Sequence, residues 1–274
     1  MILGLRAHDF GRHEPEELVK RISDAGFETA QLALLKAISG IECFEDINER
    51  VLERVRRAFE NRSITIGVLG CYMEIGLTDK EARLAEVAKF LLGIEHGVAV
   101  GADLVGTETS WFVPEDESKR EPAYQGLKDS VLRMVERAEK LEIDIGVEPV
   151  AVHTMNSAQI TRRLLDEIGS KRLRVIFDPI NLIKTQEDID NQLMLINHFL
   201  DILGDDIAAV HIKDIIIEDG EIIWRNIGKG AIDFTPIFSW FRDKGRSIPI
   251  MREEVNPESY QVDIDEMRRL NQCH

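Results

Sequence analysis

The sequence predicts an α/β fold of the (β/α)8 TIM barrel type. Eight short apolar runs alternate with amphipathic segments, and 274 residues divided by eight runs gives about 34 residues per repeat. A strand, a helix and a parallel strand at this spacing form a βαβ unit, and eight such units favour closure into a barrel. The expected strands are residues 2–7, 29–34, 64–69, 104–107, 143–148, 173–178, 207–212 and 248–253.

The segments between these runs have a helical period, and several begin with Asp, Ser or Pro and end with Gly. An open doubly wound sheet is the main alternative fold. The turn after the first run, LGLRAHDFGRHEPEE, contains no GxGxxG, so no dinucleotide fingerprint supports that alternative. No linker interrupts the chain, and we expect one barrel domain over residues 1–274. The expected helices include residues 15–26, 45–62, 79–102, 128–141, 157–169 and 187–206.

Composition limits the partners and the compartment. The net charge is −16 and the pI about 4.9, so the average field repels nucleic acid. The cysteines Cys43, Cys71 and Cys273 are far apart and lack CxxC spacing, as is typical of free thiols in a reducing compartment. The start, MILGLRAHDFG, is too short and polar for a signal peptide, and no apolar run approaches the roughly 20 residues of a membrane helix. We expect a cytoplasmic protein without a membrane partner; a homo-oligomer is compatible with the sequence.

Four of the late apolar runs end in residue types that bind metals: Glu148 in IGVEP, Asp178 in VIFDP, His211 in AAVHIKD and Glu253 in IPIMREE. A carboxylate or imidazole at the end of a buried strand is costly unless it is paired or bound to a metal. Because the carboxyl ends of barrel strands face a common mouth, these side chains are expected to converge. Three carboxylates and one imidazole suit one Mn²⁺, Co²⁺, Zn²⁺ or Mg²⁺ ion.

Each of these residues alone has a simpler explanation. A single strand-end Asp or Glu is more often an ion pair or a helix cap, and His211 alone is more often a core histidine. The recurrence at four strand ends is what favours a metal site.

Six segments of the chain match motifs of a known family: GVLGCYMEIGLTDKEARLAEVAKFLLGIEHGVAVGAD, VEPVAVHTMNSAQITRRLLDEI, FDPINL, AVHIKD, NIGKGAIDF and IPIMREEV. In these segments the chain resembles the xylose-isomerase-like barrel family, which includes sugar epimerases, hydroxypyruvate isomerase, inosose dehydratase and apurinic-site endonucleases. The match covers nearly the whole chain, and its shorter motifs are specific only in combination. The resemblance implies a mononuclear divalent site from Glu148, Asp178, His211 and Glu253, with both glutamates placed to exchange protons with substrate. Glu253, rather than Glu254, aligns with the family's last strand.

A divalent metal site with nearby carboxylates is suited to proton abstraction beside a carbonyl. Abstraction of a proton beside a carbonyl requires a cation to stabilise the developing enediolate. Glu148 and Glu253 on opposite walls would serve the two faces of a planar intermediate, as epimerisation needs, whereas isomerisation moves the proton between neighbouring carbons. Together with the resemblance to a family of sugar epimerases, this chemistry makes isomerisation or epimerisation of a small sugar or sugar phosphate the expected function. Dehydration of a keto-inositol begins with the same step and is the nearest alternative.

Further residues are candidates for substrate contact. Lys213 follows His211 by two residues and so shares its side of the strand, where it would bind an oxyanion or phosphate or form a salt bridge across the mouth. Asn156 is either a substrate contact or the cap of the next helix. Asn181 stands where many family members carry His. The other candidates are His153 in the loop after Glu148, Trp111 as a wall for a sugar ring, and the strand-end residues Glu108 and His8.

The family and the ligand set also allow two other functions. The endonucleases of this family use three metals and extra histidines, but the corresponding positions here hold Asn181, Ile222 and Trp224. Together with the acidic charge, this disfavours phosphodiester cleavage. A non-catalytic barrel that binds a sugar or a metal would use the same ligands, and only turnover separates it from an enzyme.

Overall fold

Eight parallel strands close into a barrel in the order β1-β10-β7-β6-β5-β4-β3-β2. The computed structural model describes residues 1–245 and 247–272. Every expected strand is present, with ends within two residues of the sequence prediction. The barrel strands are β1 (Ile2–Arg6), β2 (Thr29–Leu32), β3 (Thr65–Gly70), β4 (Leu104–Glu108), β5 (Asp144–Glu148), β6 (Leu173–Phe177), β7 (Ile207–Ile212) and β10 (Pro249–Arg252).

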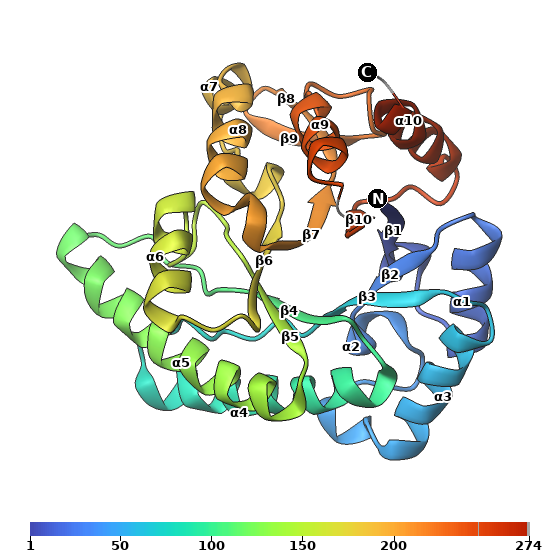
Figure 1. The fold of residues 1–274 in the computed structure, drawn as a ribbon, viewed down its shortest axis with the longest axis horizontal. Helices are drawn as coiled ribbons and strands as arrows, with labels where there is room; N and C mark the ends of the chain where they lie inside the picture. The colour runs from blue at the N-terminus through green and yellow to red at the C-terminus, as the bar shows by residue number, and fades with distance from the viewer. Residues whose placement is uncertain (246, 273–274) are drawn as a thin grey trace.

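Helices lie outside this ring of strands (Figure 1). The α-helices are α1 (Pro15–Asp24), α2 (Leu34–Ala37), α3 (Glu49–Glu60), α4 (Lys80–Val100), α5 (Arg120–Leu141), α6 (Ala158–Ile168), α7 (Gln186–Asp190), α8 (Gln192–Leu203), α9 (Thr235–Lys244) and α10 (Tyr260–Gln272). Short 3-10 helices are η1 (Ala7–Phe10), η2 (Phe44–Asp46), η3 (Glu117–Lys119), η4 (Ile180–Leu182) and η5 (Gly204–Asp206). None of the helices in the described part of the chain is long and apolar enough to cross a membrane.

The helix ends follow the capping residues of the sequence. Asp79 begins α4 by accepting a hydrogen bond from the Ala82 amide, and Gly101 ends it at φ +73. Ser157, and not Asn156, is the cap of α6, so the cap expected at Asn156 was wrong by one residue. The expected helix 187–206 is two helices, α7 and α8, which meet at Asn191.

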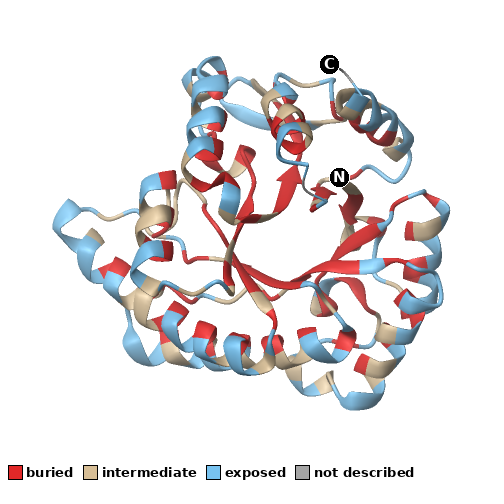
Figure 2. Ribbon diagram, in the orientation of Figure 1, coloured by how far each residue is buried: buried red, intermediate tan, exposed pale blue. Residues whose placement is uncertain are grey.

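The barrel interior is narrow and closely packed. Its buried core consists of Val68, Leu104, Ile176, Ala209 and Met251. Gly106 and Gly146 flank Ile176, and a Cβ at these positions would lie 2.5 and 2.9 Å from its side chain. Strands and inward helix faces are buried, and the outer helix faces are exposed (Figure 2). Such packing leaves the carboxyl ends of the strands as the place for a site.

The structure also contains an antiparallel hairpin that we did not expect, β8 (Asp214–Glu218) and β9 (Glu221–Arg225), outside the barrel. Its apolar residues are partly exposed: Ile222 is 41% and Trp224 43% exposed. Of the cysteines, Cys71 is a buried free thiol, Cys43 an exposed one, and Cys273 lies outside the described residues.

Candidate active site

The four strand-end residues meet at one end of the barrel. Glu148 ends β5, Asp178 follows β6, His211 lies on β7 and Glu253 follows β10. Ligand atoms of Glu148, Asp178 and His211 lie within 4.8 Å of one another, and all three residues are buried. Glu253 adjoins this group, because its Oε1 lies 3.3 Å from His211 Nδ1. Residues up to 105 positions apart thus form one cluster.

Asn181 links the two carboxylates on β5 and β6. Its Nδ2 donates a hydrogen bond to Glu148 Oε1 at 2.6 Å. Its backbone amide, with that of Ile180, donates to Asp178 Oδ1. Each carboxylate therefore has one oxygen held by the protein and one directed to the cluster: Glu148 Oε2 lies 3.3 Å from His211 Nδ1. Asn181 therefore orients Glu148 and Asp178, and the substrate contact expected for it stays a prediction.

His211 is fully buried between two glutamates. Its Nδ1 lies 3.3 Å from both Glu148 Oε2 and Glu253 Oε1, and neither ring nitrogen has a hydrogen-bond partner within the described residues. Burial opposes the charged ring, but the carboxylates of Glu148 and Glu253 outweigh it and raise the pKa of His211 to about 9. The imidazole is therefore set in strongly negative surroundings.

Glu253 and Glu254 point to different places. The Glu253 amide donates to Ile212 O, which continues the strand pairing, and the side chain turns inward at 5% residue exposure. Glu254 has a positive φ of 56 and directs its Oε1 to Arg6 Nη2 at 2.8 Å. Buried Arg252 fixes this strand end: it donates to Glu253 O and pairs with Asp263 of α10 at 3.1 Å. The inward residue is thus the one that the sequence alignment selected.

Lys213 forms the salt bridge that was one of its two expected roles. Its Nζ lies 2.9 Å from Asp178 Oδ2 and 3.1 Å from Glu253 Oε2. Although burial favours the neutral amine, Asp178 and Glu253 raise the pKa of Lys213, and Lys213 in turn helps to hold the pKa of buried Glu253 well below its usual range. The Lys213 ammonium is therefore paired with one carboxylate oxygen of Asp178 and one of Glu253.

The remaining candidates surround the mouth. Glu108, at the end of β4, has its pKa raised to about 7 by burial and by the charge of Glu148. Its Oε2 lies 3.9 Å from His153 Nε2. Trp111 pairs with His153 through the backbone and is 68% exposed, so it does not pack in the core. Burial and the charges of Arg6 and Lys36 lower the pKa of His8 to about 4, which keeps the ring neutral.

The sequence reasoning missed four further residues at this end of the barrel: Arg6, Gln31, Tyr72 and Trp224. Arg6 Nη1 lies 3.6 Å from Glu253 Oε2, and Gln31 donates to the hydroxyl of Tyr72. The Oε1 atom of Gln31 is buried without a hydrogen-bond partner among the described residues. A polar residue within a buried strand, such as Gln31, is the same sequence signal for a site residue that identified Glu148. Trp224 lies on the unexpected hairpin, with its ring centroid 5.9 Å from Lys213 Nζ.

The cluster fits a divalent cation. Three carboxylates and one imidazole form a donor set of oxygen and nitrogen, and His211 Nδ1 lies 3.3 Å from a carboxylate oxygen of both Glu148 and Glu253. His211 Nε2 is buried without a hydrogen-bond partner among the described residues, although buried polar atoms of native proteins are normally satisfied, so this nitrogen is open to a ligand that the protein itself does not supply.

The chain belongs to the xylose isomerase-like TIM barrel family, whose sequence model matches residues 19–270. Among solved structures, the fold is similar to 3-keto-D-glucoside 4-epimerase from E. coli, at TM-score 0.77 and 18% identity over 100% of both chains. It is also similar to a D-tagatose 3-epimerase-like protein, at TM-score 0.78 and 15% identity over 98% of this chain and 97% of that one. A third similar structure, the IOLI protein with bound zinc, has TM-score 0.72 and 17% identity over 99% and 95% of the two chains. No curated protein sequence matches the chain.

Proposed function

We propose that this protein is a divalent-metal-dependent isomerase or epimerase of a small sugar or sugar derivative. One observation carries the proposal: Glu148 and Glu253 both reach the same histidine nitrogen, at 3.3 Å each, from strands on different sides of the mouth. Two carboxylates that flank one small space can act on a carbon atom between them. Family membership and the sugar epimerases among the similar structures support the same reaction class.

Glu148, Asp178, His211 and Glu253 would hold the metal. When bound, a divalent cation supplies the positive charge that stabilises a substrate oxyanion during proton abstraction. Glu148 and Glu253 exchange the proton, one as base and the other as acid. Asn181 fixes the direction of the Glu148 carboxylate through its 2.6 Å hydrogen bond.

The polar wall of the mouth would bind the sugar hydroxyl groups. Gln31 Oε1 and His8 Nδ1 are buried acceptors or donors without partners among the described residues, and both suit hydroxyls. Lys213, His153, Glu108 and Trp111 are the further contacts that we propose. Lys213 is already paired with Asp178 and Glu253, so its first role is to balance the carboxylates of the cluster.

The test is exchange of substrate hydrogen with solvent deuterium. Purified protein with Mn²⁺ is incubated in D₂O with D-fructose, D-tagatose, a 3-keto-glucoside, a ketose phosphate and a keto-inositol, and each is followed by NMR. We expect deuterium at the carbon beside the carbonyl of one substrate, together with an epimer or isomer. Loss of water from the keto-inositol would assign the dehydratase reaction instead. Turnover without exchange would refute proton transfer.

Metal content is measured in parallel. Chelator-treated protein should take up about one equivalent of Mn²⁺, Co²⁺ or Zn²⁺ per chain, and an Asp178→Ala variant should take up much less. Lys20→Met, an exposed change on α1, is the control and should bind like the unchanged protein. Failure of the treated protein to bind any of the three ions would refute the metal site.

A further inference from the structure

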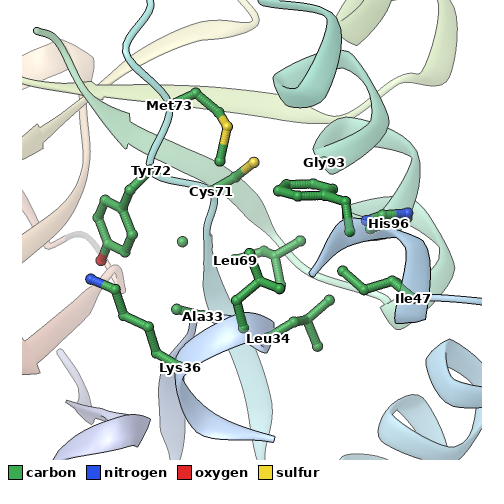
Figure 3. A pocket seen from close by; sticks show the side chains of 13 residues that line it. Ala33, Leu34, Lys36, Ile47, Leu69, Cys71, Tyr72, Met73, Gly93 and His96 are labelled. Carbon is green, nitrogen blue, oxygen red and sulfur yellow. The ribbon is translucent and has the colours of Figure 1, made fainter. Parts of the chain in front are cut away.

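A small apolar pocket lies next to the mouth, between α2, the end of β3 and α4. Its volume is about 90 Å³. Most of its wall is aliphatic, aromatic or sulfur-containing, as Figure 3 shows. Its lining includes Ala33, Lys36, Phe44, Cys71, Tyr72 and His96.

The pocket is next to the candidate site because Tyr72 belongs to both. The Tyr72 hydroxyl contacts Gln31 of β2, and burial with the charges of Glu253 and Glu148 raises the pKa of Tyr72. Lys36 Nζ lies 4.5 Å from the centroid of the Tyr72 ring, and both side chains line the pocket (Figure 3).

The lining selects an apolar occupant over water or an anion. An ordered water needs two to four polar partners, whereas the polar groups here stand at the margins of the pocket. Lys36 is engaged with the Tyr72 ring, and the His96 ring stacks on Phe44 with centroids 6.1 Å apart. Burial lowers the pKa of His96, so it adds no positive charge near neutral pH. An apolar cavity of roughly 150 Å³ binds benzene or xenon, so this smaller one suits a short alkyl group.

We propose that the pocket binds a short apolar substituent carried by the sugar substrate, such as the alkyl group of a glycoside. The inference rests on the proposed function for the sugar itself, and it adds the substituent that distinguishes preferred substrates. Tyr72 and Lys36 would then act as specificity residues, since Tyr72 lines the pocket and contacts Gln31 of the mouth, and Lys36 packs on the Tyr72 ring.

Variants of the wall change the pocket in opposite directions. Ala33→Leu adds carbon atoms to a residue that lines the pocket, and Cys71→Ala removes a sulfur atom from it. Cys43→Ala removes the same atom from an exposed residue that does not line the pocket, and it is the matched control. Thermal unfolding and circular dichroism of each variant establish that it is folded.

Binding of methyl, ethyl and propyl glucosides is measured by calorimetry with the metal-loaded protein, and xenon occupancy is measured in pressurised crystals. We expect xenon in the pocket and about fourfold tighter binding per added methylene, from the free energy of burying one CH₂ group. Ala33→Leu should abolish both effects, Cys71→Ala should extend the gain to a butyl glucoside, and Cys43→Ala should behave as the unchanged protein.

Equal affinities along the alkyl series, or absence of xenon from the pocket, would overturn the inference. If Ala33→Leu fails to fold, the chain-length limit in Cys71→Ala decides the question. Because calorimetry needs no turnover, these results are separate from the deuterium test. If affinity depends on the alkyl chain but no sugar exchanges hydrogen with solvent deuterium, the role of the pocket is supported and the proposed reaction is refuted.

Discussion

Replacement of Lys213 by methionine should destabilise the metal-free protein by about 3–5 kcal/mol, the usual cost of leaving buried charges without their partner. Lys213 is 7% exposed, and its Nζ lies 2.9 Å from Asp178 and 3.1 Å from Glu253. At an effective dielectric constant of about 20, each contact is worth roughly 5–6 kcal/mol before desolvation. Desolvation of the three ions offsets much of this sum, which brings the expected net loss back to about 3–5 kcal/mol.

The assay is urea unfolding at pH 7 with a chelator present, so that no bound cation replaces the ammonium. Lys20→Met is the control, because Lys20 and Asp24 form a 2.5 Å pair in which each side chain is 52% exposed. That pair is shorter, but solvent screens it, so its loss should lower the free energy of unfolding far less than the loss of Lys213. A loss in Lys213→Met no larger than that in Lys20→Met would refute the reasoning that burial at Lys213 decides the magnitude.

Three other predictions follow from the site and its surroundings. Glu148→Gln and Glu253→Gln should each lower turnover by about 10² to 10⁴, because an amide cannot accept the proton, whereas Lys213→Met should reduce it less completely; equal activity of all variants in the deuterium assay would contradict these roles. The protein should not incise an abasic DNA duplex above background in the presence of Mn²⁺ or Zn²⁺, and efficient metal-dependent incision would overturn this. In a Cys273→Ala background at pH 8, a thiol reagent should label exposed Cys43 and leave Cys71 unlabelled until the protein unfolds, since burial raises the pKa of Cys71 to about 12 and withholds the thiolate; rapid labelling of both would contradict it.

The period of the apolar runs determined the barrel. Strands such as residues 207–212 are buried on both faces and therefore appear in the sequence as continuous apolar segments. The ends of the helices between them are marked by capping residues such as Asp79 and Gly101. Because consecutive strands are parallel and joined by right-handed crossovers, few arrangements of the strands are possible. Because barrel strands expose their carboxyl ends at one mouth, the position of Glu148, Asp178, His211 and Glu253 at strand ends was enough to predict that they meet.

Only the tertiary structure decided what these side chains contact. The choice between the two roles of Lys213 depended on two carboxylates that lie 35 and 40 positions away in the sequence. The contact of Arg6 with Glu253 depended on β1 and β10, which become neighbours only when the ring closes. The hairpin β8–β9 does have a local signal, Asp219-Gly220 between two apolar runs, but its strands pair with each other outside the barrel and so fall outside the repeat of the barrel units. The apolar pocket has no local signal at all, since its walls come from α2, η2, β3 and α4. Periodicity records how one segment buries its own side chains, whereas ion pairs and cavities arise between segments, so no single stretch of sequence contains them.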